Sequence, residues 1–124
     1  LFVDDEPAVA RGLQRALREH DVHVCGGGAE ALERLDSERF DVVLCDLMMP
    51  DVNGMEVYRR LDEQTREQLV LVTGGAFDPE AREFLEQVSV RVLHKPIDLD
   101  EARAVIDEVT ARAPAGALHL GAAG

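Results

Sequence analysis

The sequence lacks the patterns typical of zinc-binding, secreted or membrane-spanning proteins. Its 124 residues include two cysteines and four histidines, without the Cys-x-x-Cys or Cys/His spacing that indicates zinc. No apolar run approaches the roughly 18 residues of a membrane span, and no basic leader precedes a secretory apolar segment. We therefore expect a cytoplasmic setting. Cys25 and Cys45 each end an apolar run, and we expect both to be reduced core residues.

Positive charge is also scarce in this chain. Lys and Arg number 13 against 25 Asp and Glu, which gives a formal net charge of −12. Such a chain repels phosphate backbones and anionic lipid surfaces, so we expect neither direct nucleic-acid binding nor membrane contact. The acidity alone is compatible with a cation site or with an ordinary solvated surface. The length and the 46% hydrophobic fraction suffice for one compact domain.

The glycine-rich stretch Gly26–Gly28 has neither the GxGxxG spacing nor the Walker lysine of nucleotide-binding loops. We interpret it as a loop between a strand and a helix. Residues 113–124 show little periodicity, so we expect a domain over residues 1–112 followed by a tail or linker. The chain opens at Leu1, inside an apolar run, and we expect further residues to precede it.

Five short apolar runs alternate with segments of helical periodicity. The runs are LFV (1–3), VHVC (22–25), DVVLC (41–45), LVLVT (69–73) and VRVLH (90–94). Helices are expected over residues 8–20, 29–35, 55–61, 81–88 and 99–109. Near-continuous hydrophobicity is typical of strands buried on both faces. The alternation therefore predicts an α/β fold with a five-stranded parallel sheet and five helices.

Helix starts are marked by proline and acidic residues. Pro7 stands at the first predicted start, and Pro79 follows a capping candidate, Asp78. Either Asp98 or Asp100 is expected to cap the last helix.

Polar side chains stand at the ends of four predicted strands. Asp4 and Asp5 follow the first, Asp46 the third, Thr73 ends the fourth, and Lys95 follows the fifth. Because the carboxyl ends of parallel strands share one edge of the sheet, we expect these side chains to converge. Crowded carboxylates raise one another's pKa unless a cation relieves them. Mg²⁺ (or Mn²⁺) is the natural candidate, because it prefers oxygen ligands.

The predicted cluster suits phosphoryl chemistry. Asp5 and Asp46 would ligate the metal directly, with Asp4 acting through water. A carboxylate can also attack phosphorus and form an aspartyl phosphate, whose charge the metal, Lys95 and Thr73 would share. Each residue alone has an ordinary explanation as a helix cap, a solvated lysine or a strand threonine. Their combination at one edge favours a site.

These motifs resemble the receiver domain of two-component response regulators, over residues 1–112. They are VDDEP (3–7), VVLCDLMMPDVNG (42–54), LVTGG (71–75) and HKPID (94–98). The resemblance implies a three-layer, doubly wound, flavodoxin-like fold with strand order 2-1-3-4-5. The stretches TGGAF, AREFL and KPID further resemble receivers at the C-terminal end of hybrid sensor histidine kinases. In that setting the domain would lie at the cytoplasmic face of a membrane-bound kinase.

The resemblance also implies a role for each residue of the cluster. Asp46 would accept a phosphoryl group from the phosphohistidine of a histidine kinase or a histidine phosphotransfer domain. Asp4 and Asp5 match the acidic metal pair, and Met48 would supply a backbone carbonyl to Mg²⁺. Lys95 matches the phosphate-contacting lysine.

Further family positions surround these residues. Thr73 matches the switch hydroxyl, and Gly74 would meet the phosphate at its backbone amide; Gly75 has no assigned role. Gly54 matches the family's turn glycine after the acceptor, and a cis bond is expected before Pro96.

One position departs from the family pattern. Three residues before the lysine, the family commonly has Phe or Tyr, whereas this chain has Val92. Valine has a stiff χ1 and no ring to rotate. We expect phosphorylation to alter mainly the loop after Thr73 and the helix over 81–88, with a smaller response in the strand over 90–94.

Three functions compete. The first is a signalling switch that assists its own phosphorylation and dephosphorylation but turns over no external metabolite. The second is a Mg²⁺-dependent phosphatase with an aspartyl intermediate, but this class needs an acid two residues after the nucleophile, where Met48 stands. The third is a degenerate receiver that only binds proteins; the complete set of site residues argues against it.

The last two predicted helices and the strand between them also suggest a surface for self-association. Their charged residues either pair across a homodimer or simply face solvent. They are Arg82, Glu83, Glu86, Glu101, Arg103 and Asp107.

Overall fold

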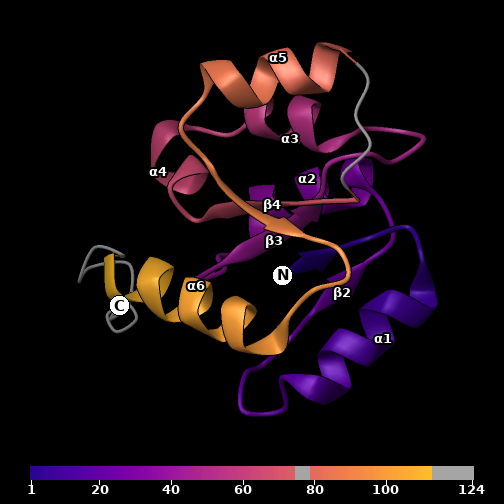
Figure 1. The fold of residues 1–124 in the computed structure, drawn as a ribbon, viewed down its shortest axis with the longest axis vertical. Helices are drawn as coiled ribbons and strands as arrows, with labels where there is room; N and C mark the ends of the chain where they lie inside the picture. Colours follow the sequence, from indigo (N-terminus) through magenta and orange to yellow (C-terminus); the bar gives the residue numbers. More distant parts are fainter. Residues whose placement is uncertain (75–78, 113–124) are drawn as a thin grey trace.

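The computed structural model describes residues 1–74 and 79–112, which form a parallel sheet between two layers of helices (Figure 1). The strands are β1 (Phe2–Val3), β2 (Val24–Cys25), β3 (Val43–Asp46), β4 (Leu69–Thr73) and β5 (Arg91–His94). They lie in the order β2-β1-β3-β4-β5, and every neighbouring pair is parallel. The expected sheet and strand order are confirmed.

Six helices, one more than predicted, occur in the described residues. They are α1 (Pro7–Ala16), α2 (Gly28–Ser37), α3 (Gly54–Arg60), α4 (Glu63–Arg66), α5 (Pro79–Gln87) and α6 (Leu99–Arg112). The prediction of five was wrong because α4 is a single polar turn without a buried residue, so it has no apolar periodicity. Its start depends instead on Asp62, whose carboxylate accepts a hydrogen bond from the backbone N–H of Thr65 at 2.8 Å.

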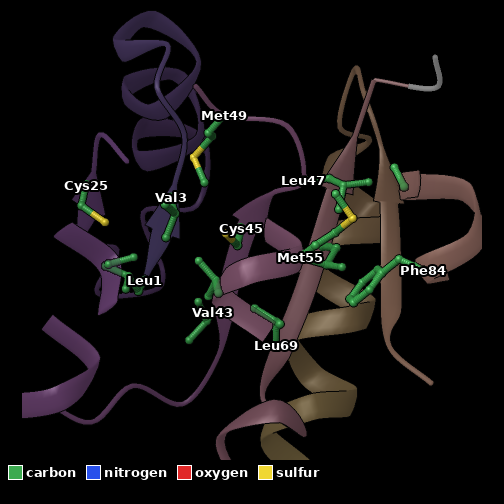
Figure 2. Close-up of a cluster of buried hydrophobic side chains, with 14 residues drawn as sticks. Leu1, Val3, Cys25, Val43, Cys45, Leu47, Met49, Met55, Leu69 and Phe84 are labelled. Carbon is green, nitrogen blue, oxygen red and sulfur yellow. The ribbon is translucent and has the colours of Figure 1, made fainter. Parts of the chain in front are cut away.

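The two helix layers cover opposite faces of the sheet. In Figure 1, α2, α3 and α5 lie above the sheet, and α1 and α6 lie below it. Alternate residues of the central strands enter the two cores: Leu71 packs with the first set of helices, and Val70 and Val72 pack with the second. Figure 2 shows side chains of the first core, including Cys45 and Phe84. Burial on both faces explains why the strands read as continuous apolar runs.

Several local predictions are confirmed. Cys25 and Cys45 are both buried and free. Pro7 is the first residue of α1, and Asp98, rather than Asp100, caps α6 by accepting a hydrogen bond from the N–H of Glu101 at 2.9 Å. The bond between Lys95 and Pro96 is cis.

Other predictions differ from the structure or fall beyond it. The first helix ends at Ala16 instead of His20, because the backbone of Leu17, its C-cap residue, leaves the helical conformation with φ −104° and ψ 49°. Asp78, Gly75 and the predicted tail over 113–124 lie outside the described residues. Among the helices that are described, none has the length and apolar character needed to span a bilayer.

Candidate phosphoryl-accepting site

The parallel sheet brings the predicted residues to one edge. Asp46 is the last residue of β3 and Thr73 the last of β4. Asp4 follows β1 directly, and Lys95 follows β5. Since β1, β3, β4 and β5 are consecutive in the sheet, residues far apart in the sequence meet outside their carboxyl ends.

Three carboxylates form the acidic part of this edge. Asp4, Asp5 and Asp46 each offer one oxygen, and these oxygens all lie within 4.8 Å of one another. Asp4 and Asp46 are buried, with 1% and 5% of their surfaces exposed, whereas Asp5 is exposed. The set has a buried floor and an open side, and it contains only oxygen donors, which suits a hard divalent cation.

Asp4 gives the clearest indication that the edge can hold a cation. One of its oxygens, Oδ1, accepts a hydrogen bond from the N–H of Glu6 at 2.8 Å. The other, Oδ2, is buried and accepts no hydrogen bond from residues 1–74 or 79–112, although the Lys95 ammonium lies 3.3 Å away. The proximity is an electrostatic contact without hydrogen-bond geometry. Buried polar atoms are rarely left without such a bond, so a cation bound here would complete the surroundings of Oδ2.

Lys95 lies among three acidic side chains. Its Nζ is 3.0 Å from Asp46 Oδ2, 3.3 Å from Asp4 Oδ2 and 3.7 Å from Glu6 Oε1. Burial lowers the pKa of Lys95, but its hydrogen bond with Asp46 and the charges of Asp46 and Asp4 outweigh this, so the pKa lies above its usual value. The ammonium is therefore firmly charged and neutralises part of the cluster.

Glu6 is part of this site, and the sequence prediction did not include it. It directly follows the acidic pair in the VDDEP motif, which was the available signal. Its side chain is 65% exposed, so its interaction with Lys95 is screened by solvent and weaker than those of the buried acids.

The environment of Asp46 opposes its ionisation. Burial raises the pKa of Asp46, and the nearby charge of Asp4 adds to this, while Lys95 acts in the opposite direction; the net shift is upward. The N–H of Met48 donates to Asp46 Oδ1 at 3.3 Å. The Met48 residue itself is 42% exposed. This carboxylate is thus close to an ammonium, and 7% of its side-chain surface is exposed. A carboxylate in such a place can act as a nucleophile toward phosphorus.

Thr73, at the end of β4, is joined through its backbone to Lys95. Thr73 is buried, and its carbonyl accepts a hydrogen bond from the backbone N–H of Lys95 at 2.8 Å. Gly74 is exposed, and among the described residues no atom lies within 4 Å of where a Cβ would stand. The described residues therefore leave room for a ligand beside the Gly74 Cα.

Gly54 allows the chain to pass close to Asp46. A Cβ at this position would lie 2.9 Å from the backbone carbonyl oxygen of Asp46, which is too close for any other residue. The N–H of Gly54 also bonds to the carbonyl of Leu47 at 2.9 Å. The loop after β3 therefore returns at Gly54 to the residue that follows the strand, Leu47.

Comparison with known proteins was made by family model and by sequence. The model described as response regulator receiver domain matches residues 1–107. The response regulator ArlR of Staphylococcus saprophyticus is 28% identical over 116 residues, which are 92% of this chain and 53% of that protein. ArlR of Staphylococcus aureus matches with the same identity and coverage. The chain thus spans about half the length of the curated relatives it matches.

Solved structures give the same fold. The receiver domain of a Francisella response regulator has a TM-score of 0.76 at 24% identity, covering 91% of this chain and 96% of that one. The receiver domain of a signal transduction histidine kinase from Syntrophus aciditrophicus has a TM-score of 0.78 at 22% identity, covering 92% of each chain.

Proposed function

Because the chain belongs to the response regulator receiver domain family, we propose that it is a phosphoryl-accepting switch in which Asp46 is the phosphoacceptor. The donor is the phosphohistidine of a histidine kinase or of a histidine phosphotransfer domain. One observation carries the proposal: the Asp46 carboxylate lies 3.0 Å from the Lys95 ammonium and within 4.8 Å of oxygens from Asp4 and Asp5.

The reaction transfers a phosphoryl group from a histidine nitrogen of the donor to a carboxylate oxygen of Asp46. An Asp46 carboxylate oxygen attacks the phosphorus, the P–N bond breaks, and the departing imidazole keeps the electron pair and takes up a proton. Lys95, 3.0 Å from the acceptor, neutralises charge on the phosphoryl oxygens. The Thr73 hydroxyl and the Gly74 amide donate to them once the group is attached.

Mg²⁺ or Mn²⁺ fits the oxygen donors at this edge. Asp4, Asp5 and Asp46 would hold the ion together with the backbone carbonyl of Met48. The buried Asp4 oxygen, which accepts no hydrogen bond within the described part of the chain, supports this assignment. When bound, the ion draws charge from the phosphoryl group during transfer. The protein residues keep their own roles of orienting the acceptor and neutralising it.

Attachment of the phosphoryl group adds charge to the sheet edge, and we propose that the surface formed by α5 and β5 reports it. Val92 on β5 has no ring to rotate. On α5, in contrast, Phe84 packs edge-on against Tyr58 of α3, with ring centroids 5.3 Å apart. The response is therefore expected to be larger at the α3–α5 contact than in β5.

The module is proposed to extend over residues 1–112, followed by a tail, within a longer signalling protein. A hybrid histidine kinase with this domain at its C-terminal end, at the cytoplasmic face of a membrane, remains our prediction for the setting. The gene sequence on both sides of this segment tests it: a kinase core upstream supports the hybrid, and a DNA-binding domain downstream contradicts it.

Phosphorylation is tested by mass spectrometry. The protein is incubated with Mg²⁺ and a small phosphodonor such as acetyl phosphate, and we expect a gain of one phosphoryl group that hydroxylamine removes. Asp46→Asn should show no gain. Asp41→Asn, an exposed acid at the start of the same apolar run, should behave as the wild type. Absence of a gain in the wild type would favour the degenerate, protein-binding module.

A further inference from the structure

The Gly26–Gly28 stretch, which the proposed function leaves unexplained, receives a loop from elsewhere in the chain. The N-cap of α2 is Gly27, which has no side chain to satisfy the first N–H groups of the helix. Asp51, in the loop after the phosphoacceptor, supplies the missing acceptor: its Oδ2 accepts a hydrogen bond from the N–H of Ala29 at 3.3 Å. A helix is thus capped by a residue 22 positions away in the sequence.

The glycines make this contact sterically feasible. A Cβ at Gly27 would lie 3.0 Å from Asp51 Oδ2, and a Cβ at Gly28 would overlap the backbone carbonyl of Val52. Side chains at these positions would therefore displace the loop from α2. Gly27 and Gly28 therefore provide the space in which residues 51 and 52 pack, whereas a Cβ at Gly26 would meet no atom of the described residues within 4 Å.

Asp51 is also electrostatically suited to this position. Hydrogen bonds from the backbone N–H of Val52 and, further, from those of Ala29 and Gly28 hold the pKa of Asp51 below its usual range. A permanent negative charge at the N-terminus of α2 is favourable, because the helix dipole is positive there.

The anchored loop is the one that leaves Asp46. Its inner part is fixed by the hydrogen bond from Gly54 to Leu47 and by that from Met48 to Asp46. Its outer part reaches α2, where Asp51 is bound. Met48 lies between these two attachments, so the direction of its backbone depends on both.

We infer that Asp51 is a positioning residue, which acts through its contact with the N-terminus of α2 to hold the Met48 backbone in place for a divalent cation. The inference rests on the proposed function, since it concerns the metal site proposed there. Asp51 itself touches neither the cation nor the phosphoryl group. Its loss leaves the three carboxylates in place but frees the loop that supplies the fourth protein ligand.

The test is a Mg²⁺ titration followed by amide resonances in ¹H–¹⁵N spectra, which reports binding without phosphorylation. For Asp51→Ala we expect the dissociation constant to rise about tenfold, the lower end of the range for residues that support metal ligands. Asp51→Asn keeps an oxygen acceptor and should recover most of the affinity. Gly27→Ala, which crowds the Asp51 carboxylate, should weaken binding by a smaller factor.

Asp62→Ala is the matched control, since Asp62 also caps a helix through its side chain but belongs to α4, which contributes nothing to the metal site. It should lose a helix cap without a change in Mg²⁺ affinity. If Asp51→Ala binds Mg²⁺ as tightly as the wild type, or if Asp62→Ala loses as much Mg²⁺ affinity as Asp51→Ala, the inference is overturned but the proposed function is not. A wild type that binds no Mg²⁺ would overturn the proposed metal site and the inference with it.

Discussion

Replacing Lys95 by methionine removes the positive charge of the site while nearly keeping its length. The ammonium lies 3.0 and 3.3 Å from oxygens of Asp46 and Asp4. Both acids are buried, so they cannot regain full hydration when the ammonium is gone. At an effective dielectric constant near 20, each contact is worth about 5 kcal/mol before desolvation is considered. Removing one partner of a buried ion pair typically costs about 3–5 kcal/mol.

We therefore expect Lys95→Met to lower the free energy of unfolding by about 3 kcal/mol in the absence of divalent cations. The lower end is appropriate because Asp46 can become protonated once Lys95 no longer opposes its raised pKa. The exposed Glu6 adds little. The loss should be largest at alkaline pH and smaller as the pH falls toward the carboxyl range, where protonation removes the uncompensated charge.

Magnesium should reverse much of this loss. At about ten times its dissociation constant, a ligand specific for the folded state adds about 1.4 kcal/mol. Because the competing ammonium is gone, Mg²⁺ should also bind Lys95→Met more tightly than the wild type. Urea unfolding followed by circular dichroism, in EDTA and in Mg²⁺, measures both effects.

The control for this experiment is Arg91→Met. Arg91 also belongs to β5 and pairs with Glu108 at 3.0 Å, but this pair lies at the surface and should contribute less than about 1 kcal/mol. Its removal should be insensitive to Mg²⁺. The reasoning is refuted if Lys95→Met unfolds in EDTA like Arg91→Met, or if Mg²⁺ stabilises it no more than the wild type.

Three further predictions follow from the burial and packing described above. In EDTA, Asp46→Asn should be more stable than the wild type at neutral pH, because burial raises the Asp46 pKa. The wild type should gain stability as the pH falls through that raised pKa. In urea unfolding, the stability difference between the two proteins should therefore disappear at acidic pH. Burial raises the pKa of Cys25 from 9.0 to about 11, so its thiolate fraction at pH 8, and its rate with a thiol reagent such as DTNB, should be about 100-fold lower than for an unperturbed thiol; rapid labelling of the folded protein would contradict this. Addition of beryllofluoride, a phosphoryl mimic, should shift the ring resonances of Tyr58 and Phe84 more than the methyl resonances of Val92, and the reverse order would refute a response centred on α5.

The strands and the acidic cluster could be predicted because their signals are local. A strand buried on both faces is a continuous apolar run, and the residue at its end belongs to the carboxyl edge whatever the rest of the chain does. Asp46 and Lys95 were identified in this way. The order of the strands could not be predicted from such local signals, since no apolar pattern distinguishes one neighbour from another. The expected order rested on the family resemblance.

Features that depend on long-range contacts were missed. In the sequence, Asp51 cannot be told from an ordinary loop acid; only the structure places it against α2. The roles of Gly27 and Gly28 follow from their contacts with this loop. Glu6 could not be assigned to the cluster from the sequence, because its distance to Lys95 depends on how the strand ends meet in the fold. The short helix α4 was missed because capping, without an apolar face, determines where it begins.

The backbone hydrogen bond from the N–H of Lys95 to the carbonyl of Thr73 holds the ends of β4 and β5 next to each other. This bond joins the two backbones, whereas the Thr73 hydroxyl and the Lys95 ammonium are carried on side chains that turn about their own bonds. In the proposed switch, the hydroxyl and the ammonium therefore start from strand ends held at a fixed separation, and each adjusts to the phosphoryl group by rotation of its own side chain.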